Sequence, residues 1–387
     1  MQGCQGDHAM TEQIRNCSSE FLPMSSTAVG TSEEPPINQL RRCKLIVSYD
    51  GTRYCGFQRQ SSSSSISRYH EGIGGEKTKR RRPNNEIKKK VKNRGVVTTT
   101  VQEILEDALE FYTGLTREEM RIRFAGRTDS GVHARGQVVV LSLPSAIVRG
   151  NETTARHEND VDMGSERLWK IRKSINSRLP IDISIENVSQ CDKESFDPRL
   201  DAKSKQYSYS LRYRELKSIA LTKGGSVNDD DHDEKIYPIC LNGGPPLLRT
   251  ALDSNRVWIC PWALDDSKLQ RYCENLSGTH DYSAFVHKEA RNTRDNQMTI
   301  DRLYYERIKF RDDKVPIWEV RFLVEAKGFG RAQVRNIVGF LVDVCRGSFK
   351  DQESSHDWFW KEDPERLAKQ INSAPANGLC LEKVFYN

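Results

Sequence analysis

The succession of strand and helix patterns along the chain constrains its fold more than any other feature. Residues 43–49 alternate as an apolar strand that ends in an Asp-Gly turn, and apolar residues at helical spacing follow from 101 to 109. The segment GQVVVLSL at 136–143 is apolar enough for a central strand. A comparable order of strand, helix and strands returns between 204 and 386. This repetition predicts an α+β protein built from two similar halves.

Local signals place the elements around one short connection. Thr100 and Glu103 have the spacing of a capping box at the start of the first helix. The segment 120–125, MRIRFA, alternates as a half-buried strand, and the loop GRTDSGVH separates it from the strand at 136–143. We therefore expect Asp129 to lie in a loop between two strands, which is where a rigid sheet can hold a reactive group.

Further elements are expected in the second half. Lys205, Tyr207 and Tyr209 alternate on one face of a strand, and a capped helix from 265 ends at Gly278. A strand at 317–326 then precedes a helix at 331–347.

Three polar segments interrupt or precede these elements. Residues 1–42 are expected to form a disordered tail, which leaves an N-terminal half at 43–145 and a C-terminal half at 146–387. The basic run 61–95 is read as an insertion in the first half, either a solvated linker, a nucleic-acid arm or a nuclear import signal. The glycine-rich and acidic segment at about 215–255 is a second insertion. Its acidic cluster lacks the fixed spacing of a metal site, so no metal is expected.

Charge and cysteine usage limit the class of protein. The 387 residues carry a net charge of +6, which permits a polyanionic partner without proving one. The 10 cysteines include no C-x-x-C pair, so neither a zinc ribbon nor a redox motif is indicated, and reduced thiols of an intracellular protein are expected. No apolar run approaches the roughly 20 residues that span a bilayer, so no membrane partner is expected. We favour cytoplasm or nucleus and leave plastid and mitochondrion open.

Three residues each allow two interpretations, an ordinary structural role and a role in catalysis. Asp129 is either an ordinary turn former or a reactive carboxylate placed between Arg127 and Arg135. Tyr207 is either a packed sheet aromatic or an acid or base in a site. Arg335 lies off the centre of the apolar stripe of its helix, as a solvent-facing cation would.

Six motifs taken together resemble the tRNA pseudouridine synthases of the TruA family. They occur in the family's order and cover most of the chain outside the tail and the two insertions. The motifs are YDGTRYCGFQRQ (49–60), TVQEILEDAL (100–109), FAGRTDSGVHARGQVV (124–139), FDPRLDAKSKQYSYSL (196–211), GFGRAQVRNIVGFLVDV (328–344) and APANGLCLEKVFY (374–386).

The resemblance implies a fold, a partner and roles for single residues. The fold would be two ferredoxin-like halves whose sheets join into one extended mixed, mainly antiparallel sheet with a central catalytic cleft. The protein would be a homodimer that grips tRNA, needs no metal or organic cofactor, and converts uridine to pseudouridine at positions 38–40 of the anticodon stem-loop. Asp129 would be the catalytic aspartate, Tyr207 the active-site tyrosine and Arg335 the cation paired with the aspartate. Leu379 would line the pocket, and Arg127 would occupy the vacated base position.

The chemistry of the reaction agrees with those roles. Isomerisation breaks the N1–C1′ bond, turns the base and rejoins it at C5, which calls for one carboxylate in a dry pocket. Burial raises a carboxyl pKa and a nearby cation lowers it. A cation such as Arg335 is therefore expected beside the buried carboxylate. The uridine must be flipped out of its stem, and phosphate contacts are expected from Arg53, Arg59 and Lys203.

Some interpretations stay open at this stage. His133 is read as a loop-packing residue because the chemistry does not require it. Gln333 and Cys380 depart from the family, where methionine and an aromatic are frequent, and both are expected to reshape the pocket floor. One alternative is a relaxed-specificity synthase that acts at other tRNA positions or on other RNAs. The other is a noncatalytic RNA-binding protein on the same scaffold, against which the presence of all three catalytic candidates argues.

Overall fold

The structure is a computed structural model that describes most of the chain outside the tail and the insertions. The described residues are 40–59, 99–149, 160–215, 250–311, 317–349, 355 and 357–386. The expected insertion 61–95 lies outside them, as do the expected tail up to residue 39 and residues 216–249 of the second insertion.

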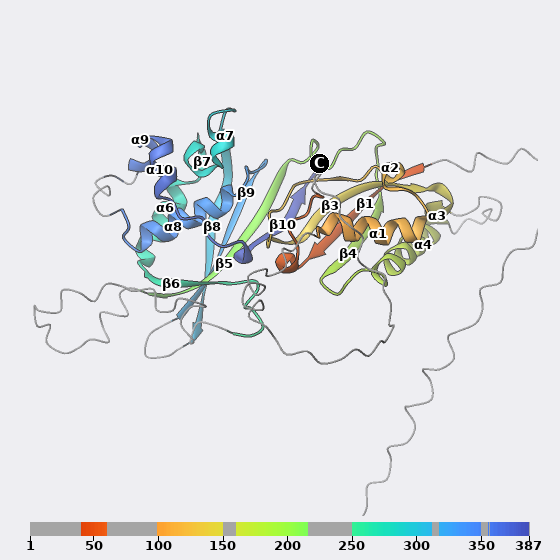
Figure 1. Cartoon of the computed structure of the whole chain (residues 1–387), viewed down its shortest axis with the longest axis horizontal. Coiled ribbons are helices and arrows are strands. Elements are labelled where there is room, and N and C mark those ends of the chain that lie inside the picture. The colour runs from red at the N-terminus through yellow and green to blue at the C-terminus, as the bar shows by residue number, and fades with distance from the viewer. Residues whose placement is uncertain are drawn as a thin grey trace, which may run out of the picture. The chain divides into compact units, whose positions relative to one another are not determined.

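The first half has the strand order of a ferredoxin-like fold (Figure 1). Its strands pair in the order β4-β1-β3-β2, and every pair is antiparallel. Helix α1 follows β1 and helix α4 follows β3, which completes the β-α-β-β-α-β sequence of that fold. The elements are β1 (Leu40–Tyr49), α1 (Val101–Thr113), α2 (Arg117–Met120), β2 (Arg123–Phe124), β3 (His133–Pro144), α3 (Ser145–Arg149), α4 (Asp160–Asn176) and β4 (Ile183–Gln190).

The second half repeats that order. Its main strands pair as β10-β5-β9-β8, with α6 between β5 and β8 and α8 between β9 and β10. Strand β7 extends the far edge, and β6 pairs in parallel with the end of β5. The elements are β5 (Ser204–Glu215), β6 (Trp258–Leu264), α6 (Asp266–Asn275), β7 (Gly278–Asp281), α7 (Lys288–Arg291), β8 (Gln297–Arg311), β9 (Ile317–Ala326), α8 (Gln333–Cys345), α9 (Trp358–Lys361), α10 (Pro364–Gln370) and β10 (Leu379–Phe385).

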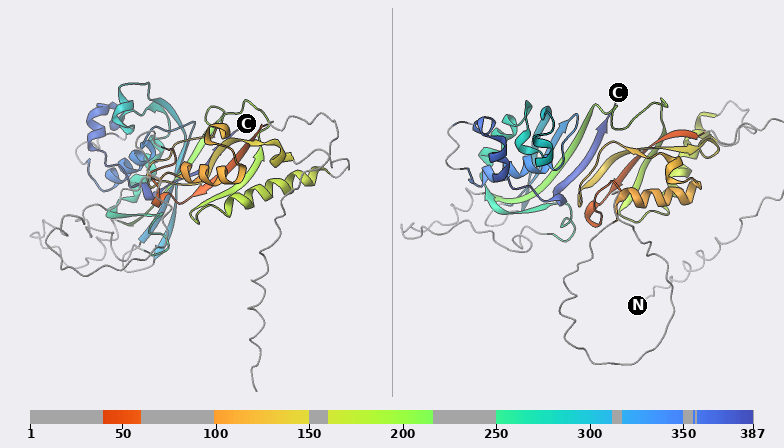
Figure 2. Two further views of the ribbon diagram at one scale, coloured as in Figure 1. Left: turned by 45° about the vertical axis from the view of Figure 1, so that its right-hand side comes forward. Right: turned by 45° about the horizontal axis from the view of Figure 1, so that its top comes forward.

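The two half-sheets join where β10 pairs in parallel with β3 (Figure 2). The junction uses the first residues of β3, where His133 pairs with Cys380 and Ala134 with Leu381. The result is one 10-stranded mixed sheet within the described residues, and most of its pairs are antiparallel. This confirms the α+β class and the extended, mainly antiparallel mixed sheet that the resemblance implied.

A row of buried side chains crosses the junction on one face of the sheet. Partners directly opposite each other on neighbouring strands share a face. By this rule Tyr49 on β1, Ala134 on β3, Leu381 on β10, Tyr207 on β5 and Val324 on β9 form one continuous row. All five are at most 8% exposed, so the hydrophobic core continues from one half into the other.

The sequence signals predicted some element ends and missed others. Both hydrogen bonds of the capping box at Thr100 are present, and α1 ends at Gly114 in the left-handed conformation with φ 70°. The strand expected at 120–125 shortens to β2, because α2 occupies its first position. The helix expected to end at Gly278 ends at Asn275 instead.

Candidate functional site

The loop that carries Asp129 connects β2 to β3 and is held mainly through its backbone. The Ala125 amide donates to the Val138 carbonyl oxygen at 2.9 Å, and Gln137 Nε2 donates to the Gly126 carbonyl oxygen at 2.7 Å. Gln137 is 0% exposed, so the side chain that makes this bond is fully buried. The start of the loop is therefore fixed to the strand that follows it.

The segment after β1 holds the middle of the same loop. The Phe57 amide donates to the Thr128 carbonyl oxygen at 3.2 Å, and the Gly131 amide donates to the Tyr54 carbonyl oxygen at 3.3 Å. Gly56 adopts φ +106°, and a Cβ at that position would lie 2.7 Å from the Thr128 carbonyl oxygen. Only glycine allows this conformation and this approach together. The glycine of the CGFQ motif thus serves the placement of the neighbouring Asp129.

A buried hydroxyl pair lies immediately before Asp129. Tyr49 Oη and Thr128 Oγ1 are 2.8 Å apart, and both residues are at most 7% exposed. Burial raises the pKa of Tyr49, so this side chain stays a neutral phenol at physiological pH. Neither Tyr49 nor Thr128 was identified as a site residue from the sequence, although Thr128 is part of the GRTD motif.

Tyr207 lies beside the loop on the fourth residue of β5. A Cβ placed on Gly126 would be 3.9 Å from Tyr207 Oη, and the Phe329 ring meets the Tyr207 ring edge to face at 5.4 Å between centroids. Burial, reinforced by the Asp129 carboxylate, raises the pKa of Tyr207. The hydroxyl therefore keeps its proton and is close enough to Asp129 to feel the charge of its carboxylate.

The hydroxyl of Tyr207 differs from those of its neighbours on the strand. Tyr209 Oη donates to the Pro375 carbonyl oxygen at 2.8 Å, and Tyr213 Oη donates to Asp266 Oδ1 at 2.8 Å. Across the described ranges, Tyr207 Oη has no hydrogen-bond partner although the residue is only 8% exposed. The oxygen is not among the fully buried atoms that lack a partner, so this unpaired hydroxyl next to a carboxylate is accessible and is a candidate for contact with substrate.

Asp129 itself is half-buried. Its backbone carbonyl oxygen accepts from the Val132 amide at 3.1 Å. Its carboxylate accepts no hydrogen bond and forms no ion pair with any residue of the described segments. An aspartate whose only role is to form a turn usually bonds to a backbone amide, as Asp50 does with the Thr52 amide at 3.0 Å. The Asp129 side chain is thus available for chemistry.

Arg335 lies in the first turn of α8 and contacts the chain that leads to β10. Its Nε donates to the Ala374 carbonyl oxygen at 2.7 Å, and the Ala374 amide donates back to the Arg335 carbonyl oxygen at 3.0 Å. Its charge also opposes the large rise in the pKa of Tyr209 that burial causes. Among the described residues no ion pair joins Arg335 to Asp129, so the structure does not bring the expected pair together.

Three positions that the family resemblance singled out, two at the start of β10 and one at the start of α8, are largely buried in the structure. Leu379 begins β10, is 7% exposed and pairs with Tyr209. Cys380 is largely buried, and burial raises the pKa of its thiol to about 12. Gln333 is 1% exposed and accepts from the Gly330 amide at 2.6 Å, which fixes the turn before α8. Whether Gln333 also reshapes the pocket floor stays a prediction.

Lys205 is a site residue that our sequence analysis placed on the Tyr207 face without giving it a role. Its Nζ donates to the Ala125 carbonyl oxygen at 2.6 Å, so this lysine on the second half holds the start of the Asp129 loop on the first half. Burial, with a smaller effect from Arg199, lowers the pKa of Lys205. The signal was available, because a residue two positions before Tyr207 must point to the same face of the strand.

The cations expected to contact phosphate, and Arg127, expected at the vacated base position, differ in their partners. The Arg53 guanidinium forms an ion pair with Asp182 at 2.6 Å, while its side chain is 65% exposed. Arg127 is exposed, and its side chain has no ion-pair partner within the described ranges. Lys203 is also exposed, and its backbone amide donates to the Phe385 carbonyl oxygen at 2.9 Å. Arg127 and Lys203 are therefore the more accessible cations.

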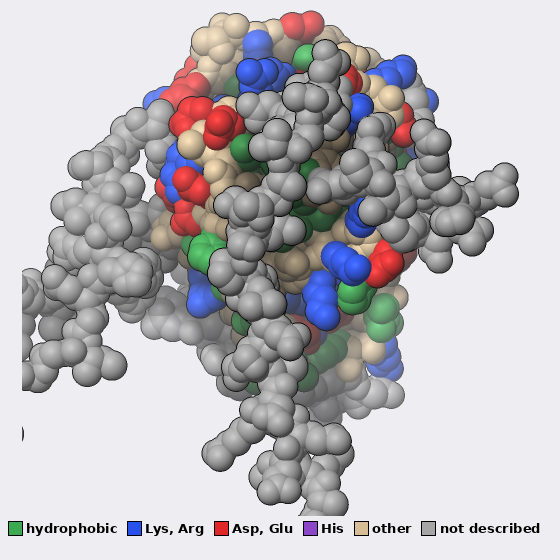
Figure 3. Space-filling view, turned by 90° about the vertical axis from the view of Figure 1, so that its right-hand side faces the viewer, with side chains coloured by type: hydrophobic (Ala, Val, Ile, Leu, Met, Phe, Trp, Pro, Cys, Tyr) green, Lys and Arg blue, Asp and Glu red, His purple; other side chains and the backbone are tan. Residues whose placement is uncertain are grey.

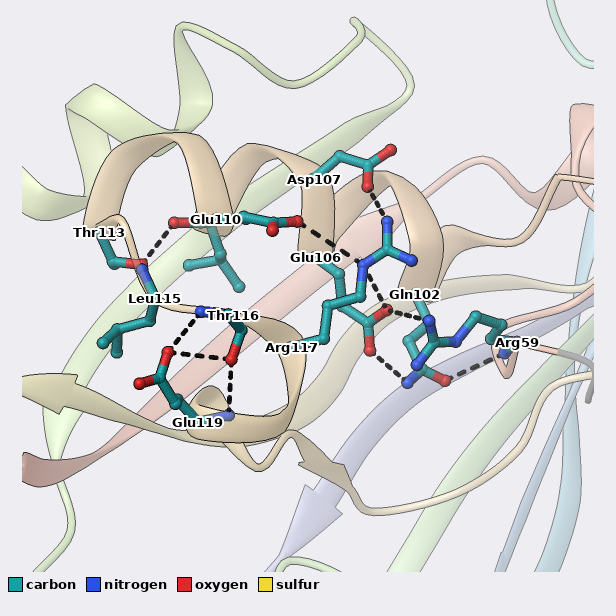
Figure 4. A network of polar contacts seen from close by, with 11 residues as sticks. Arg59, Gln102, Glu106, Asp107, Glu110, Thr113, Leu115, Thr116, Arg117 and Glu119 are labelled. Atoms are coloured by element: carbon teal, nitrogen blue, oxygen red, sulfur yellow. Dashed lines mark hydrogen bonds and ion pairs between the residues drawn. The ribbon is translucent and has the colours of Figure 1, made fainter. Parts of the chain in front are cut away.

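Arg59 belongs to a polar network on α1 (Figure 4). Its backbone amide donates to Gln102 Oε1 at 3.0 Å, and its Nη1 lies 3.6 Å from Glu106 Oε2. Arg117 approaches the same Glu106 oxygen at 3.7 Å. Burial raises the pKa of the Glu106 carboxyl, whereas Gln102 and the two arginines lower it less. Arg59 is thus tied to α1 by both its backbone and its side chain.

The surface of the described residues offers few other functional candidates. Acidic and basic side chains are interspersed on the part of the first half that Figure 3 leaves visible. No group of three or more His, Cys, Asp or Glu in the described segments is arranged to hold a metal ion. None of the helices in these segments has the length and apolarity needed to cross a membrane.

Comparisons with known proteins agree with this geometry. A family described as tRNA pseudouridine synthase matches residues 272–387. In all, 482 curated relatives also match, and the named ones among the most similar are tRNA pseudouridine synthases A. That of Thermodesulfovibrio yellowstonii is 27% identical over 89% of this chain and 98% of its own length. Those of Clostridium kluyveri and Thermosipho africanus are 27% and 28% identical over 90% of this chain and their full length.

The relatives extend over both halves and over the loop, the strand and the helix that carry the three catalytic candidates. The paired ferredoxin-like topology and the order of the six motifs agree with the same assignment. Over most of its length the chain is therefore similar to the TruA-type tRNA pseudouridine synthases.

Proposed function

We propose that the protein isomerises uridine to pseudouridine at positions 38–40 of the tRNA anticodon stem-loop, with Asp129 as the reacting carboxylate. Similarity to the tRNA pseudouridine synthases supports the reaction class, and the resemblance of the motifs supports the positions. The single observation that carries the role of Asp129 is its unpaired carboxylate in a loop whose backbone is fixed from several sides.

The reaction needs only a few groups. The N1–C1′ bond breaks, a C5–C1′ bond forms, the hydrogen on C5 leaves to solvent, and N1 takes up a proton. The protein must supply a carboxylate near the ribose and a surface that holds the displaced base. Asp129 provides the carboxylate, and the rings of Tyr207 and Phe329 provide the apolar surface beside it.

Tyr207 serves as a neutral donor in this proposal. Its raised pKa keeps the proton on Oη at physiological pH, so the hydroxyl donates to the ribose or to the Asp129 carboxylate and does not act as a phenolate. Because the hydroxyl is unpaired within the described residues, no protein hydrogen bond has to break before it does so.

Arg335 and Leu379 act from the second half. Arg335 holds the segment before β10 through Ala374, and Leu379 packs in the core at the start of that strand. In the proposal, binding of the flipped uridine brings the Arg335 charge next to the Asp129 carboxylate in a pocket closed to water. Arg127, as an exposed cation in the same loop, occupies the place that the uridine leaves.

The expected assembly follows from the same resemblance. We expect a homodimer that binds tRNA across both copies, and we favour the cytoplasm or the nucleus as its compartment, with plastid and mitochondrion left open. Light scattering on the purified full chain tests the first expectation, and localisation of the tagged full chain tests the second.

Release of tritium from tRNA labelled at C5 of uridine tests the reaction, because this hydrogen leaves only when C5 forms the new glycosidic bond. The native chain should release tritium, and Asp129→Asn should release none while it still binds tRNA. Asp192→Asn is the matched control, since it removes one negative charge from an exposed loop residue and should leave the rate unchanged. Full activity of Asp129→Asn would refute the role of the aspartate.

Mapping of the product tests the choice of uridine. Carbodiimide modification followed by primer extension locates pseudouridine in each treated tRNA. Stops confined to positions 38–40 support the proposal. Tritium release with stops elsewhere would replace it with the relaxed-specificity alternative.

A further inference from the structure

His133 is the first residue of β3 and follows Asp129 by four positions. Its imidazole is 5% exposed and lies outside the groups that the proposed chemistry uses. It also lies at the junction of the two half-sheets, because its backbone pairs with Cys380 of β10. A side chain at this position contacts both halves of the protein.

The hydrogen bonds of the imidazole determine its tautomer. The Gly51 amide donates to His133 Nδ1 at 3.1 Å, so Nδ1 must offer a lone pair. His133 Nε2 lies 2.9 Å from the Asn255 carbonyl oxygen and 3.2 Å from the Asn377 carbonyl oxygen. Both of these oxygens only accept, so Nε2 carries the proton. The ring is therefore neutral and in a single tautomer.

The three partners come from three separate segments. Gly51 belongs to the turn after β1 in the first half. Asn255 precedes β6, and Asn377 lies two residues before Leu379, both in the second half. Asn377 Nδ2 also donates to the Val257 carbonyl oxygen at 3.3 Å. One imidazole thus links the end of the Asp129 loop to the turn that begins β10.

Few charged or titratable groups face the ring. Asp50 Oδ1 lies 3.2 Å from His133 Nδ1, and the other Asp50 oxygen lies 3.5 Å from Arg256 Nε. The Cys380 thiol across the strand pair stays protonated, since burial raises its pKa to about 12. Burial lowers the pKa of His133, and Asp50 opposes that effect more weakly.

Protonation would change the contact with Gly51. A proton on Nδ1 would face the Gly51 N–H, so two donors would meet where a donor now meets a lone pair. The new N–H would turn to Asp50, and the ring would leave the geometry that holds the two carbonyl oxygens. The link between the halves therefore depends on the neutral ring.

We propose that neutral His133 is a positioning residue that holds the Asp129 loop against the segment leading to Leu379, so that turnover depends on it and falls when the ring is protonated. The predicted effect on the rate rests on the proposed function. The hydrogen bonds of the His133 ring, however, involve none of the groups that take part in the proposed chemistry. They predict that binding of tRNA is insensitive to the ring, because none of its partners is an exposed cation.

Two variants separate the two sides of the ring. His133→Asn retains an acceptor near the position of Nδ1, and His133→Gln retains a donor near the position of Nε2. His287→Asn is the matched control, because His287 begins the short helix α7 and has a partly exposed side chain. Thermal unfolding of each variant first establishes that the chain is folded.

The first measurement is tritium release from C5-labelled tRNA between about pH 5 and pH 8. Each His133 variant should lose about 10-fold or more in kcat, with KM within about twofold of the native value, because misplacement of a catalytic group lowers turnover. The native rate should fall on the acid side of about pH 6.5, and the variants should lack that fall. Native kcat in both variants, an effect on KM alone, or an unchanged acid limb would overturn the proposal.

The second measurement does not depend on activity. Amide hydrogen exchange at pH 7 should be faster in residues 125–133 and 376–381 of both variants than in the native chain and in His287→Asn. Unchanged exchange in both segments would overturn the proposal even if the rate fell. If the native chain releases no tritium, the proposed function fails, and the exchange result still decides whether His133 links the two halves.

Discussion

The substitution Gly51→Ala tests whether the Asp129 loop must be held in one place. Gly51 lies in the turn after β1, and its backbone approaches the residue that ends the Asp129 loop. A Cβ added at Gly51 would lie 2.0 Å from the Val132 carbonyl oxygen and 2.5 Å from its carbonyl carbon. Both atoms are backbone, so no side-chain rotation relieves the contact.

The size of the effect follows from these distances. Real Cβ atoms do not approach other heavy atoms to within 3.0 Å, so the Val132 carbonyl must move from 2.0 Å to at least 3.0 Å, or about 1 Å. Overpacking of this kind costs about 1–3 kcal/mol of stability. A displacement of about 1 Å at a catalytic group costs about 10²-fold in rate. Val132 is three residues from Asp129, and its amide bonds to the Asp129 carbonyl oxygen, so the movement reaches the carboxylate.

Tritium release and urea unfolding together measure the two effects. Gly51→Ala should lower kcat by about 10²-fold, which corresponds to about 2.7 kcal/mol in the barrier. Its KM should change less than its kcat, because the displacement acts on the carboxylate that reacts. Gly114→Ala is the matched control, since its φ of +70° imposes strain of about 1 kcal/mol while a Cβ there meets no atom within 4 Å. That variant should lose stability and keep its turnover.

One comparison decides the matter. If Gly51→Ala turns over within about twofold of Gly114→Ala at equal fractions of folded protein, the position of the loop does not limit the rate. The argument that the backbone of this loop is fixed for catalysis would then be wrong.

Two further predictions concern single side chains. Tyr207→Phe removes the unpaired hydroxyl and keeps the ring against Phe329, so kcat should fall by about 10²-fold or more while tRNA binding persists; equal kcat would assign Tyr207 to stacking alone. Burial raises the folded-state pKa of Glu106, so the native chain loses stability as the pH rises through that pKa. Glu106→Gln should remove this dependence and leave the free energy of unfolding in urea at pH 7 no lower than that of the native chain. A loss of more than about 1 kcal/mol in that free energy would show that the ion pairs outweigh burial.

Periodicity and capping signals predicted most elements of each half. The strand at 317–326 was predicted with the bounds that β9 has, and Thr100 begins α1 as its capping box indicated. The same signal was missed at Thr116 and Glu119, whose capping box is complete in the structure. It starts α2 and removes Met120 from the expected strand. A local hydrogen-bond pattern therefore overrode an alternating apolar pattern there.

Local sequence patterns could not predict how the two half-sheets pair. The parallel contact of β10 with β3 joins His133 to Cys380, residues that are 247 positions apart by their numbers. No turn residue or period specifies such a pairing. The resemblance implied the joined sheet, but the residues that meet at the junction emerge only from the register.

The candidate site, like the fold, was predicted from the sequence only in part. Motif matches identified Asp129, Tyr207, Arg335 and Leu379, because each belongs to a recognisable stretch. They did not identify how the loop is held, since Lys205 acts on it from another strand and a separate half. The relation between Arg335 and Asp129 was also not readable, because it depends on the side-chain conformation of Arg335, which contacts Ala374 in the structure.

The arrangement of the halves explains why neither is sufficient for the site. Each half has the same strand order, and the Asp129 loop is the connection between the second and third strands of the first half. Tyr207, Arg335 and Leu379 all come from the second half. Tyr207 reaches the loop because β10 pairs with the end of β3 that follows it, and β5 lies next to β10, whereas Arg335 contacts Ala374 before β10. A fragment ending at residue 145 keeps the aspartate and loses every other catalytic candidate. In the proposed function, catalysis therefore depends on the junction of the half-sheets as much as on the carboxylate.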